Sequence, residues 1–372
     1  MKISPFKLER YFAKYEFSAK HLVSSSDCDG FSLKEILELA TTDEIRLWEE
    51  LKLGYTESQG LPILREEISK LYSKLVPDDI MVLTPEEGIF IAMNCVLGKG
   101  DHVICIAPSY QSLHQVVKSI GCDITFWKPN EEMNWYFNPD DIEKALQPNT
   151  RLIIVNFPHN PTGYLPSVED YLRIVDIAKR NNLFLFSDEM YRYLEHDASL
   201  RLPSASDLYE NAVSLSGMSK TFGLAGLRIG WLSTKNKELL EEMISFKDYT
   251  TICNSAPSEI LAFIALRHND VLVNSNLEKI KKNLQLFDDF INKHKRILSW
   301  CKPNAGTIAF ARLNVNHSAL HFCEEVVSET GIMLVPSEMF DYGDKHIRLG
   351  FGRKNLSEGL SIWDEYLNNY KG

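Results

Sequence analysis

A single lysine, Lys220, stands among small residues in the segment "SLSGMSKTFGLAGLRIGW" (214–231), and Arg228 follows it eight positions later. Charged residues are the class least often buried in soluble proteins, so a surface position is the first interpretation of a lysine. The serines and glycines before Lys220, however, leave little side-chain bulk, and such a stretch lets a ligand approach the backbone closely. The segment therefore predicts a binding site that presents an amine.

Two other polar segments follow apolar runs. "NFPHNPTG" (156–163) comes after "RLIIV" and contains Asn160, and "DEMY" (188–191) comes after "LFLFS" and begins with Asp188. Taken singly, the first has the composition of an ordinary turn, and Asp188 could be a helix N-cap. If the apolar runs are parallel strands, all three polar segments meet beyond their carboxyl ends, where such folds bind ligands.

The chemistry that needs these groups together is that of pyridoxal 5′-phosphate. A Schiff base of this cofactor requires a lysine amine, a carboxylate for the pyridine nitrogen, donors for the ring oxygen and ligands for the phosphate. Lys220 would supply the amine, and Asp188 would keep the ring nitrogen protonated, so that the ring withdraws electrons from the substrate Cα. We therefore expect pyridoxal phosphate as the cofactor.

The middle of the chain alternates short apolar runs with helical patterns, which predicts a mainly parallel sheet covered on both faces. The runs rich in Val, Ile and Phe are 102–107, 123–127, 151–157, 183–189, 212–216 and 228–233, and the helical patterns include 112–121 and 167–182.

Composition excludes several classes of function. The chain has 372 residues, of which 44% are hydrophobic, enough for two domains or for one large domain with an appendage. A formal net charge of −11 argues against binding to nucleic acid or to anionic membranes. The N-terminus has no apolar leader, and no apolar run approaches the ~18 residues of a membrane span. We expect a cytoplasmic protein.

The cysteines and histidines give no diagnostic metal or disulfide pattern. Seven cysteines are odd in number and never form a C-x-x-C pair, so we expect reduced core residues. His317 and His321 are four residues apart on a predicted helix, with Cys323 close by. No third ligand has a diagnostic spacing, and we expect no metal site.

In the order of these motifs, the chain resembles a fold-type I pyridoxal-phosphate enzyme of the class I/II aminotransferase family over nearly its whole length. The resemblance implies that Lys220 is the Schiff-base lysine and that Asp188 pairs with the pyridine nitrogen. It also implies that Asn160 and Tyr191 contact the 3-oxygen of the ring, with Asn160 near the substrate as well.

Further residues take roles by the same resemblance. Tyr110, in "APSYQS", matches the aromatic residue that stacks on the pyridine ring, although it could also be a buried core tyrosine. Arg228 is similar to the phosphate-binding arginine, whose planar guanidinium suits a bidentate contact. Tyr55, in "GYTESQG", resembles a tyrosine that reaches the phosphate in the neighbouring subunit, which implies a homodimer. Arg348, in "KHIRLGFGR", resembles the arginine that binds the substrate α-carboxylate, while Arg353 is interpreted as structural.

Two positions depart from the family pattern at the phosphate. Residues 84–88 read "TPEEG" where the family has glycine and small residues. Pro85 has no N–H, and Glu86 and Glu87 bring negative charge towards a negative ligand. Either the two carboxylates point away while their backbone amides still donate, or this side of the phosphate site is weaker.

The second departure concerns the position three before the lysine, which is often a hydroxyl residue in the family and is Gly217 here. Ser219 or Ser216 must then supply a hydroxyl contact, and we include Ser219 among the cofactor-binding residues.

The implied fold is an α/β fold with a three-layer α/β/α large domain over residues 45–280. The smaller α/β domain comprises residues 1–44 and 281–372, and the helical pattern of 275–298 joins the two.

We expect an aminotransferase of amino-acid metabolism that acts on an amino acid and a 2-oxo acid. The alternative is a lyase, decarboxylase or cyclase that uses the same site, because family membership does not fix the reaction. Segments 110–122 and 248–259 resemble the capreomycidine-synthase-like branch more than the aspartate aminotransferases. A non-catalytic regulator is a third interpretation, but such proteins usually carry an additional DNA-binding domain. The acidic segment "SSSDCDGF" (24–31), next to the expected substrate pocket, favours neutral or basic amino acids.

Overall fold

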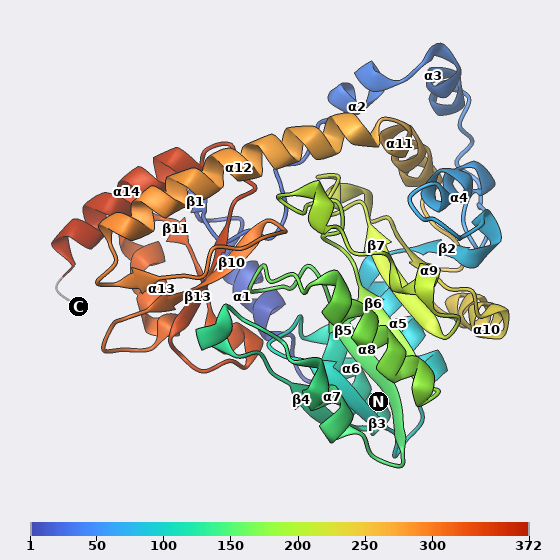
Figure 1. The fold of residues 1–372 in the computed structure, drawn as a ribbon. Coiled ribbons are helices and arrows are strands. Elements are labelled where there is room, and N and C mark those ends of the chain that lie inside the picture. Colours follow the sequence, from blue (N-terminus) through green and yellow to red (C-terminus); the bar gives the residue numbers. More distant parts are fainter. Residues whose placement is uncertain (1, 371–372) are drawn as a thin grey trace.

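The computed structural model describes residues 2–370, and its centre is a seven-stranded sheet (Figure 1). From one edge to the other the strands are β2 (Ile80–Leu83), β8 (Gly230–Ser233), β7 (Ala212–Gly217), β6 (Phe184–Asp188), β5 (Thr150–Asn156), β3 (His102–Ile106) and β4 (Asp123–Trp127). The strands β3 to β7 run parallel, whereas β8 is antiparallel to both of its neighbours. This topology confirms the mainly parallel sheet predicted from the sequence.

Helices cover both faces of the sheet because successive residues of a strand point to opposite sides. In β3, Val103 and Cys105 belong to one hydrophobic cluster, and Ile104 and Ile106 belong to another. The three-layer α/β/α prediction is therefore confirmed. The first cluster is completed by α5 (Pro85–Val96), α6 (Ser112–Ile120) and α10 (Lys237–Lys247), and the second by α7 (Pro139–Ala145), α8 (Val168–Arg180) and α9 (Ala205–Leu208).

Two element boundaries differ from the prediction, and one strand was not predicted. β8 begins at Gly230, because Arg228 adopts a left-handed conformation (φ 55°) that a strand excludes. β2 was not predicted, since its four residues are too few to establish a pattern. The helix expected at 275–298 is α12 (Asn269–Lys293), which follows α11 (Ala256–Arg267) after a single residue and ends five residues earlier than expected.

A smaller α/β unit lies beside the large sheet, and α12 runs along both parts (Figure 1). α1 (Lys7–Tyr15) packs on this unit through Leu8 and Tyr11, which share a hydrophobic cluster with Phe310 and Phe340. The other elements of the unit are the parallel pair β1 (His21–Leu22) and β11 (Ile332–Met333), the antiparallel strands β12 (Val335–Pro336), β13 (His346–Gly350), β10 (Ile308–Leu313) and β9 (Leu298–Ser299), and the helices α13 (Ala319–Thr330) and α14 (Leu356–Asn369).

The helices after β1 pack on the large unit. Ile36 of α2 (Leu33–Leu39) shares a hydrophobic cluster with Leu64 of α4 (Pro62–Ser69) and Ile264 of α11, and α3 (Thr42–Glu49) also contacts α11. The expected boundary after residue 44 thus falls within α3. The division into 45–280 and the two flanking segments stays a prediction. Among residues 2–370, no helix is long and apolar enough to span a membrane.

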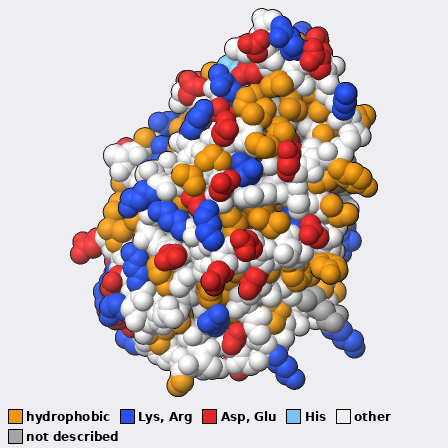
Figure 2. Space-filling model, turned by 90° about the vertical axis from the view of Figure 1, so that its right-hand side faces the viewer, with side chains coloured by type: hydrophobic (Ala, Val, Ile, Leu, Met, Phe, Trp, Pro, Cys, Tyr) orange, Lys and Arg blue, Asp and Glu red, His pale blue; other side chains and the backbone are white. Residues whose placement is uncertain are grey.

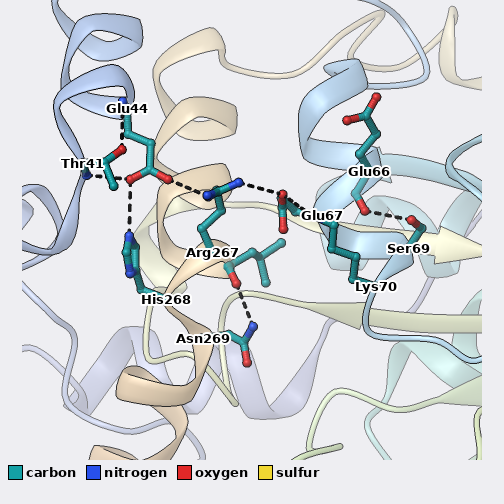
Figure 3. A network of polar contacts seen from close by, with 10 residues as sticks. Thr41, Glu44, Glu66, Glu67, Ser69, Lys70, Arg267, His268 and Asn269 are labelled. Atoms are coloured by element: carbon teal, nitrogen blue, oxygen red, sulfur yellow. Dashed lines mark hydrogen bonds and ion pairs between the residues drawn. The ribbon is translucent and has the colours of Figure 1, made fainter.

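A polar network holds α3, α4 and α11 together (Figure 3). Glu44 of α3 accepts an N–H hydrogen bond at the helix N-terminus and forms an ion pair with Arg267 of α11, with 2.7 Å between Oε1 and Nε. The Nη1 atom of Arg267 lies 3.5 Å from Oε1 of Glu67 in α4. Because α3 and α4 flank residues 50–61, the network fixes both ends of the loop that carries Tyr55.

Candidate active site

A cavity of about 520 Å³ lies beyond the carboxyl ends of β5, β6 and β7, where α1 and the smaller unit close over the sheet. Its volume is in the range of small-molecule sites. Tyr55 and Glu87 do not line it. The sequence-predicted residues in its wall are Glu86, Tyr110, Asn160, Asp188, Tyr191, Ser219, Lys220, Arg228 and Arg348.

Lys220 follows β7 by three residues and is half-buried in the cavity wall. Its Nζ donates a hydrogen bond to Ser26 Oγ at 2.9 Å. Burial lowers the pKa of the amine, because the protein supplies less solvation than water does to an ammonium ion. A lowered pKa increases the fraction of neutral amine, which is the form that can accept a proton or attack a carbonyl carbon.

Asp188 ends β6 and is buried beside Lys220. Its Oδ1 accepts a hydrogen bond from the backbone N–H of Met190 at 3.2 Å. Burial raises the pKa of Asp188 to about 7, because desolvation disfavours the carboxylate. A ligand with a basic nitrogen at this position would share a proton with Asp188 and offset that desolvation.

Arg348 lies in the middle of β13 with an exposed fraction of 0%. Its Nε donates to the backbone carbonyl of Ser24 at 3.1 Å and its Nη1 to Oδ1 of Asn160 at 3.3 Å, while Nη2 has no hydrogen-bond partner. Asp341, an acidic residue seven positions before Arg348 in the sequence, forms an ion pair with Lys7 and not with Arg348. Among residues 2–370, therefore, no carboxylate neutralises this guanidinium, and an anionic ligand is the natural partner.

Asn160 and Tyr191 lie close to this arginine. The backbone N–H of Asn160 donates to Oδ1 of Asn156 at 2.8 Å, which fixes the loop after β5. The hydroxyl of Tyr191 is buried and has no hydrogen-bond partner among the described residues. Buried polar groups are rarely left unpaired in folded proteins, so this hydroxyl also points to a ligand.

Tyr110 has part of its ring in the cavity wall and part against Phe6, with 4.9 Å between the ring centroids. Its hydroxyl donates to Glu9 Oε1 at 2.8 Å. Because Tyr110 lies in the cavity wall, its position favours a ring that stacks on the cofactor over a buried core tyrosine.

The N-terminus of α5 explains the proline in "TPEEG". Pro85 is the first helical residue, where a backbone N–H has no intrahelical partner in any case. Its ring packs on two glycines: a Cβ atom at Gly230 would lie 2.7 Å from Pro85 Cγ, and one at Gly217 would lie 3.2 Å from it. A Cβ atom at Gly217 would also lie 2.9 Å from Gly230 Cα and 3.1 Å from the carbonyl oxygen of Ile229. The neighbouring backbone, together with Pro85, therefore leaves no room for the hydroxyl residue that is common at this position.

The two glutamates after Pro85 behave differently. The Glu87 carboxylate turns away from the cavity and accepts hydrogen bonds from the hydroxyl of Thr251 at 2.8 Å and from its backbone N–H at 3.3 Å. Glu86 lines the cavity, where its Oε2 accepts a hydrogen bond from Ser112 at 3.3 Å. Desolvation in the cleft raises the pKa of Glu86 to about 7. The alternative in which the carboxylates point away from the phosphate thus describes Glu87 but not Glu86.

Arg228 and Ser219 lie in the same part of the wall. Arg228 Nη1 donates to the carbonyl of Ala225 at 2.9 Å, and its remaining guanidinium donors are available to a ligand. Ser219 lines the cavity, whereas Ser216 belongs to β7 and does not. The geometry therefore favours Ser219 as the source of a hydroxyl contact.

Sequence reasoning missed the contribution of α1. Leu8, Phe12 and Glu16 line the cavity at intervals of four residues, a spacing that places them on one helical face, and Glu9 joins them. That four-residue spacing was the signal by which the sequence could have indicated this face of α1. The expectation that 24–31 borders the pocket is confirmed, since Ser25, Ser26 and Asp27 lie in its wall.

The histidine pair lies far along the chain, in the smaller unit. His317 and His321 lie near Glu325, with candidate ligand atoms within 4.8 Å of one another, whereas Cys323 is buried in the core. A tyrosine hydroxyl already hydrogen-bonds His317 Nε2 at 2.6 Å, and another donates to Glu325 Oε1 at 2.8 Å. Two atoms of the group are thus already hydrogen-bonded, whereas His317 Nδ1 has no hydrogen-bond partner among the described residues. The expectation of no metal stays a prediction.

Comparisons with known proteins agree with this geometry. The family model described as aminotransferase class I and II matches residues 20–359. Capreomycidine synthase of Streptomyces vinaceus is 26% identical over 368 residues, covering 98% of this chain and 94% of that protein. An aspartate aminotransferase of Sulfolobus acidocaldarius is 26% identical over 333 residues, covering 85% and 82%.

Two solved structures are similar over essentially their full lengths. A PLP-dependent aminotransferase from Streptococcus suis has a TM-score of 0.93 at 27% identity and covers 100% of both chains. The PLP-dependent cyclase OrfR has a TM-score of 0.90 at 26% identity and covers 99% of this chain and 98% of its own.

Proposed function

Because the chain belongs to the aminotransferase class I and II family, whose cofactor is pyridoxal 5′-phosphate, we propose that it transfers an amino group between an amino acid and a 2-oxo acid. The observation that carries the proposal is the convergence of Lys220, Asp188 and Arg348 on one cavity. An amine, a buried carboxyl and an unpaired guanidinium are the three groups needed to hold the cofactor, protonate its ring and bind an α-carboxylate.

The residues present fit this cofactor. The unpartnered Tyr191 hydroxyl is available for the 3-oxygen of the ring together with Asn160, and Asp188 suits the ring nitrogen. Ser219, Arg228 and the backbone amides at the start of α5 would bind the phosphate, because the N-terminus of a helix favours an anion.

When bound, the cofactor supplies an electron sink for the negative charge that develops at the substrate Cα. Arg348 orients the substrate by its α-carboxylate, so that the Cα–H bond faces the lysine. Lys220 Nζ, once free, accepts the proton from Cα, and burial, which lowers the pKa of the amine, favours the neutral form that this step needs. Asp188 holds a proton at the ring nitrogen, and Tyr110 covers the ring and excludes water.

The test is incubation of the purified holoenzyme with a panel of amino acids without a co-substrate. Transamination predicts one equivalent of the matching 2-oxo acid per active site, while the cofactor keeps the amino group. A product that retains its amino nitrogen and changes its carbon skeleton would contradict transamination.

Cyclisation or elimination at the same site is the second candidate. It is supported by the two relatives named as a synthase of capreomycidine and as a cyclase, which match the chain over 98% and 99% of its length. In this case Lys220 and Arg348 keep their roles, and release of the amino group is absent.

The affinity for the cofactor is predicted to fall as the pH rises through about 7. Glu86 faces Ser112, Arg228, Glu9 and Asp188, and its pKa of about 7 means that it is neutral below this pH and repels a phosphate above it. If bound phosphate raises the pKa of Glu86 by one further unit, the dissociation constant increases about tenfold.

The measurement is cofactor titration from pH 6 to 9 in the wild type and in Glu86→Gln. The variant removes the charge of Glu86 and leaves that of Asp188, so its affinity should be tighter above pH 7 and should lose the tenfold decrease. An equally steep decrease in the variant would assign the titration to another group.

We also propose a homodimer in which Tyr55 reaches the phosphate bound by the partner subunit. Figure 2 shows hydrophobic side chains gathered on the face over α3, α4 and α10. Two loops of this face are joined by a hydrogen bond from Thr56 to the carbonyl of Asn254. Among their exposed residues are Leu53, Tyr55 and Tyr249, with exposed fractions of 84%, 92% and 91%.

Tyr55→Phe is predicted to weaken cofactor binding about tenfold, the effect of losing one hydrogen bond to a charged group, without changing the mass in solution. Sedimentation should give a dimer for both proteins. Tyr249→Phe is the matched control, because Tyr249 is equally exposed and has no proposed ligand. A monomer, or equal effects of the two substitutions, would contradict the arrangement.

A further inference from the structure

Two carboxylates, Glu9 of α1 and Glu16, the C-cap residue that follows this helix, stand in the cavity wall without a cationic partner. Glu9 accepts one hydrogen bond, from the hydroxyl of Tyr110. Glu16 is half-buried and accepts no side-chain hydrogen bond. Among residues 2–370, no lysine, arginine or histidine nitrogen lies within the 4.0 Å of an ion pair from either carboxylate.

The surroundings of Glu16 are negative. Burial raises the pKa of Glu16, and the nearby charges of Asp27 and Glu9 raise it further. Asp27 is already paired with Arg353, whose Nη2 lies 2.8 Å from Oδ1. The charges of Arg353 and Lys220 lower the pKa of Glu16, but by less than the charges of Asp27 and Glu9 raise it. This part of the cavity thus lacks one positive charge.

The other charges of the cavity have partners in the proposed function. Arg348 would bind the substrate α-carboxylate, Arg228 the phosphate and Asp188 the ring nitrogen, while Lys220 would hold the cofactor. The phosphate adds negative charge to the cavity. Once these partners are assigned, Glu9, Glu16 and Glu86 are the carboxyl groups of the wall without a cationic partner, and Glu86 lies at the phosphate end beside Arg228. A cation for Glu9 and Glu16 can therefore come with the substrate.

The position of Glu16 fits a substrate side chain. Phe12 contacts the α-carboxylate end of the site, since the Arg348 guanidinium carbon lies 5.7 Å from its ring centroid. Glu16, the C-cap residue of α1, keeps helical backbone angles and lies one turn beyond Phe12 on the same face, about 6 Å along the helix axis. The ring of Phe12 offers an apolar surface for the methylene groups between the two ends of the substrate.

We propose that the cavity accepts amino acids whose side chain ends in an ammonium or guanidinium group, and that Glu16 binds that cation while Glu9 adds negative charge from about two helical turns away. This inference rests on the proposed site for the α-carboxylate but holds for transamination and for cyclisation alike. It assigns the substrate class that the family membership leaves open.

The experiment compares substrates that differ in charge and hardly in shape. Arginine is paired with citrulline, and lysine with norleucine, and consumption of each amino acid by the holoenzyme is followed together with the absorption change of the bound cofactor. At least one cation should exceed its neutral counterpart in kcat/KM by about 30-fold or more, which corresponds to about 2 kcal/mol. A difference in kcat/KM within the arginine pair would indicate a guanidinium site, and a difference within the lysine pair would indicate an ammonium site.

Glu16→Gln should lower kcat/KM for the cationic substrate by about 30-fold and leave its neutral counterpart within about twofold. Glu38→Gln is the control, because Glu38 is an exposed helical glutamate outside the cavity wall. Glu16→Lys should shift the preference to acidic amino acids.

Three results overturn the inference. They are equal use of cationic and neutral partners by the wild type, equal losses for both partners in Glu16→Gln, and a preference for acidic amino acids in the wild type. A response to neutral amino acids alone overturns the subsite and leaves the proposed function intact. No response to any amino acid overturns both.

Discussion

Replacing Lys220 by alanine is expected to lower kcat/KM for any amino-acid substrate by about four orders of magnitude or more. The substitution removes the covalent attachment of the cofactor and the base that accepts the Cα proton, and a positioned base alone contributes about 10²–10⁴-fold. Lys220 is only half-buried and makes one side-chain hydrogen bond, to Ser26, so its truncation should leave a folded protein. Steady-state kinetics and thermal denaturation measure the two effects separately.

Borohydride reduction of the holoenzyme gives an independent check, because the cofactor mass should be fixed on Lys220. Lys247 is the informative alternative, since it is a second lysine with a desolvated amine. Its Nζ donates to the carbonyls of Ser58 and Val82 at 2.5 and 2.8 Å, so it is engaged in holding the loop. An adduct on Lys247, or full turnover by Lys220→Ala, would remove Lys220 from the centre of the mechanism.

The sequence could predict the part of the site that the parallel sheet builds. Asn160 and Lys220 follow apolar strands and Asp188 ends one, and parallel topology brings such residues to one edge whatever the details of packing. The same reasoning located the helices on the two faces, because the alternation of buried strands and amphipathic helices is a local pattern.

The contributions of α1 and of the loop after β1 could not be predicted in the same way. Ser26 meets Lys220 across 194 residues of sequence, and Tyr110 meets Glu9 across 101. These contacts depend on how the smaller unit packs on the large one, and that packing is decided by clusters of core residues from distant segments. The pattern of α1 shows which face is apolar but not what that face contacts.

The phosphate end shows a different limit. The sequence identified "TPEEG" as a departure but left the directions of its two carboxylates open. Glu87 accepts hydrogen bonds from Thr250 and Thr251 and from the backbone N–H of Thr84, and none of these groups bonds Glu86. The bond to Thr84 belongs to a capping box, which the T-x-x-E pattern of 84–87 could have indicated. The bonds to the loop more than 160 residues away could come only from the three-dimensional structure.

Arg348→Lys is expected to lower kcat/KM for amino-acid substrates by about two orders of magnitude, which corresponds to about 2.7 kcal/mol. The substitution keeps the charge but loses the planar fork, and with it the pair of parallel hydrogen bonds that orients an α-carboxylate. Part of the loss should be in kcat, because the same contact aligns the Cα–H bond with Lys220. The absorption of the bound cofactor and the mass in solution should not change, since Arg348 is proposed to contact the substrate.

The control is Arg312→Lys on the adjacent strand β10, because Arg312 is exposed and its ion pair with Glu131 lies outside the cavity wall. An exposed pair of this kind contributes at most about 1 kcal/mol, so this variant should keep normal kinetics. Thermal denaturation of Arg348→Lys shows whether the buried ammonium is tolerated. Normal kinetics for Arg348→Lys would place the α-carboxylate elsewhere. Loss of cofactor without a change in melting temperature would instead make Arg348 a cofactor contact, and the unpaired Nη2 would then belong to the phosphate or the ring.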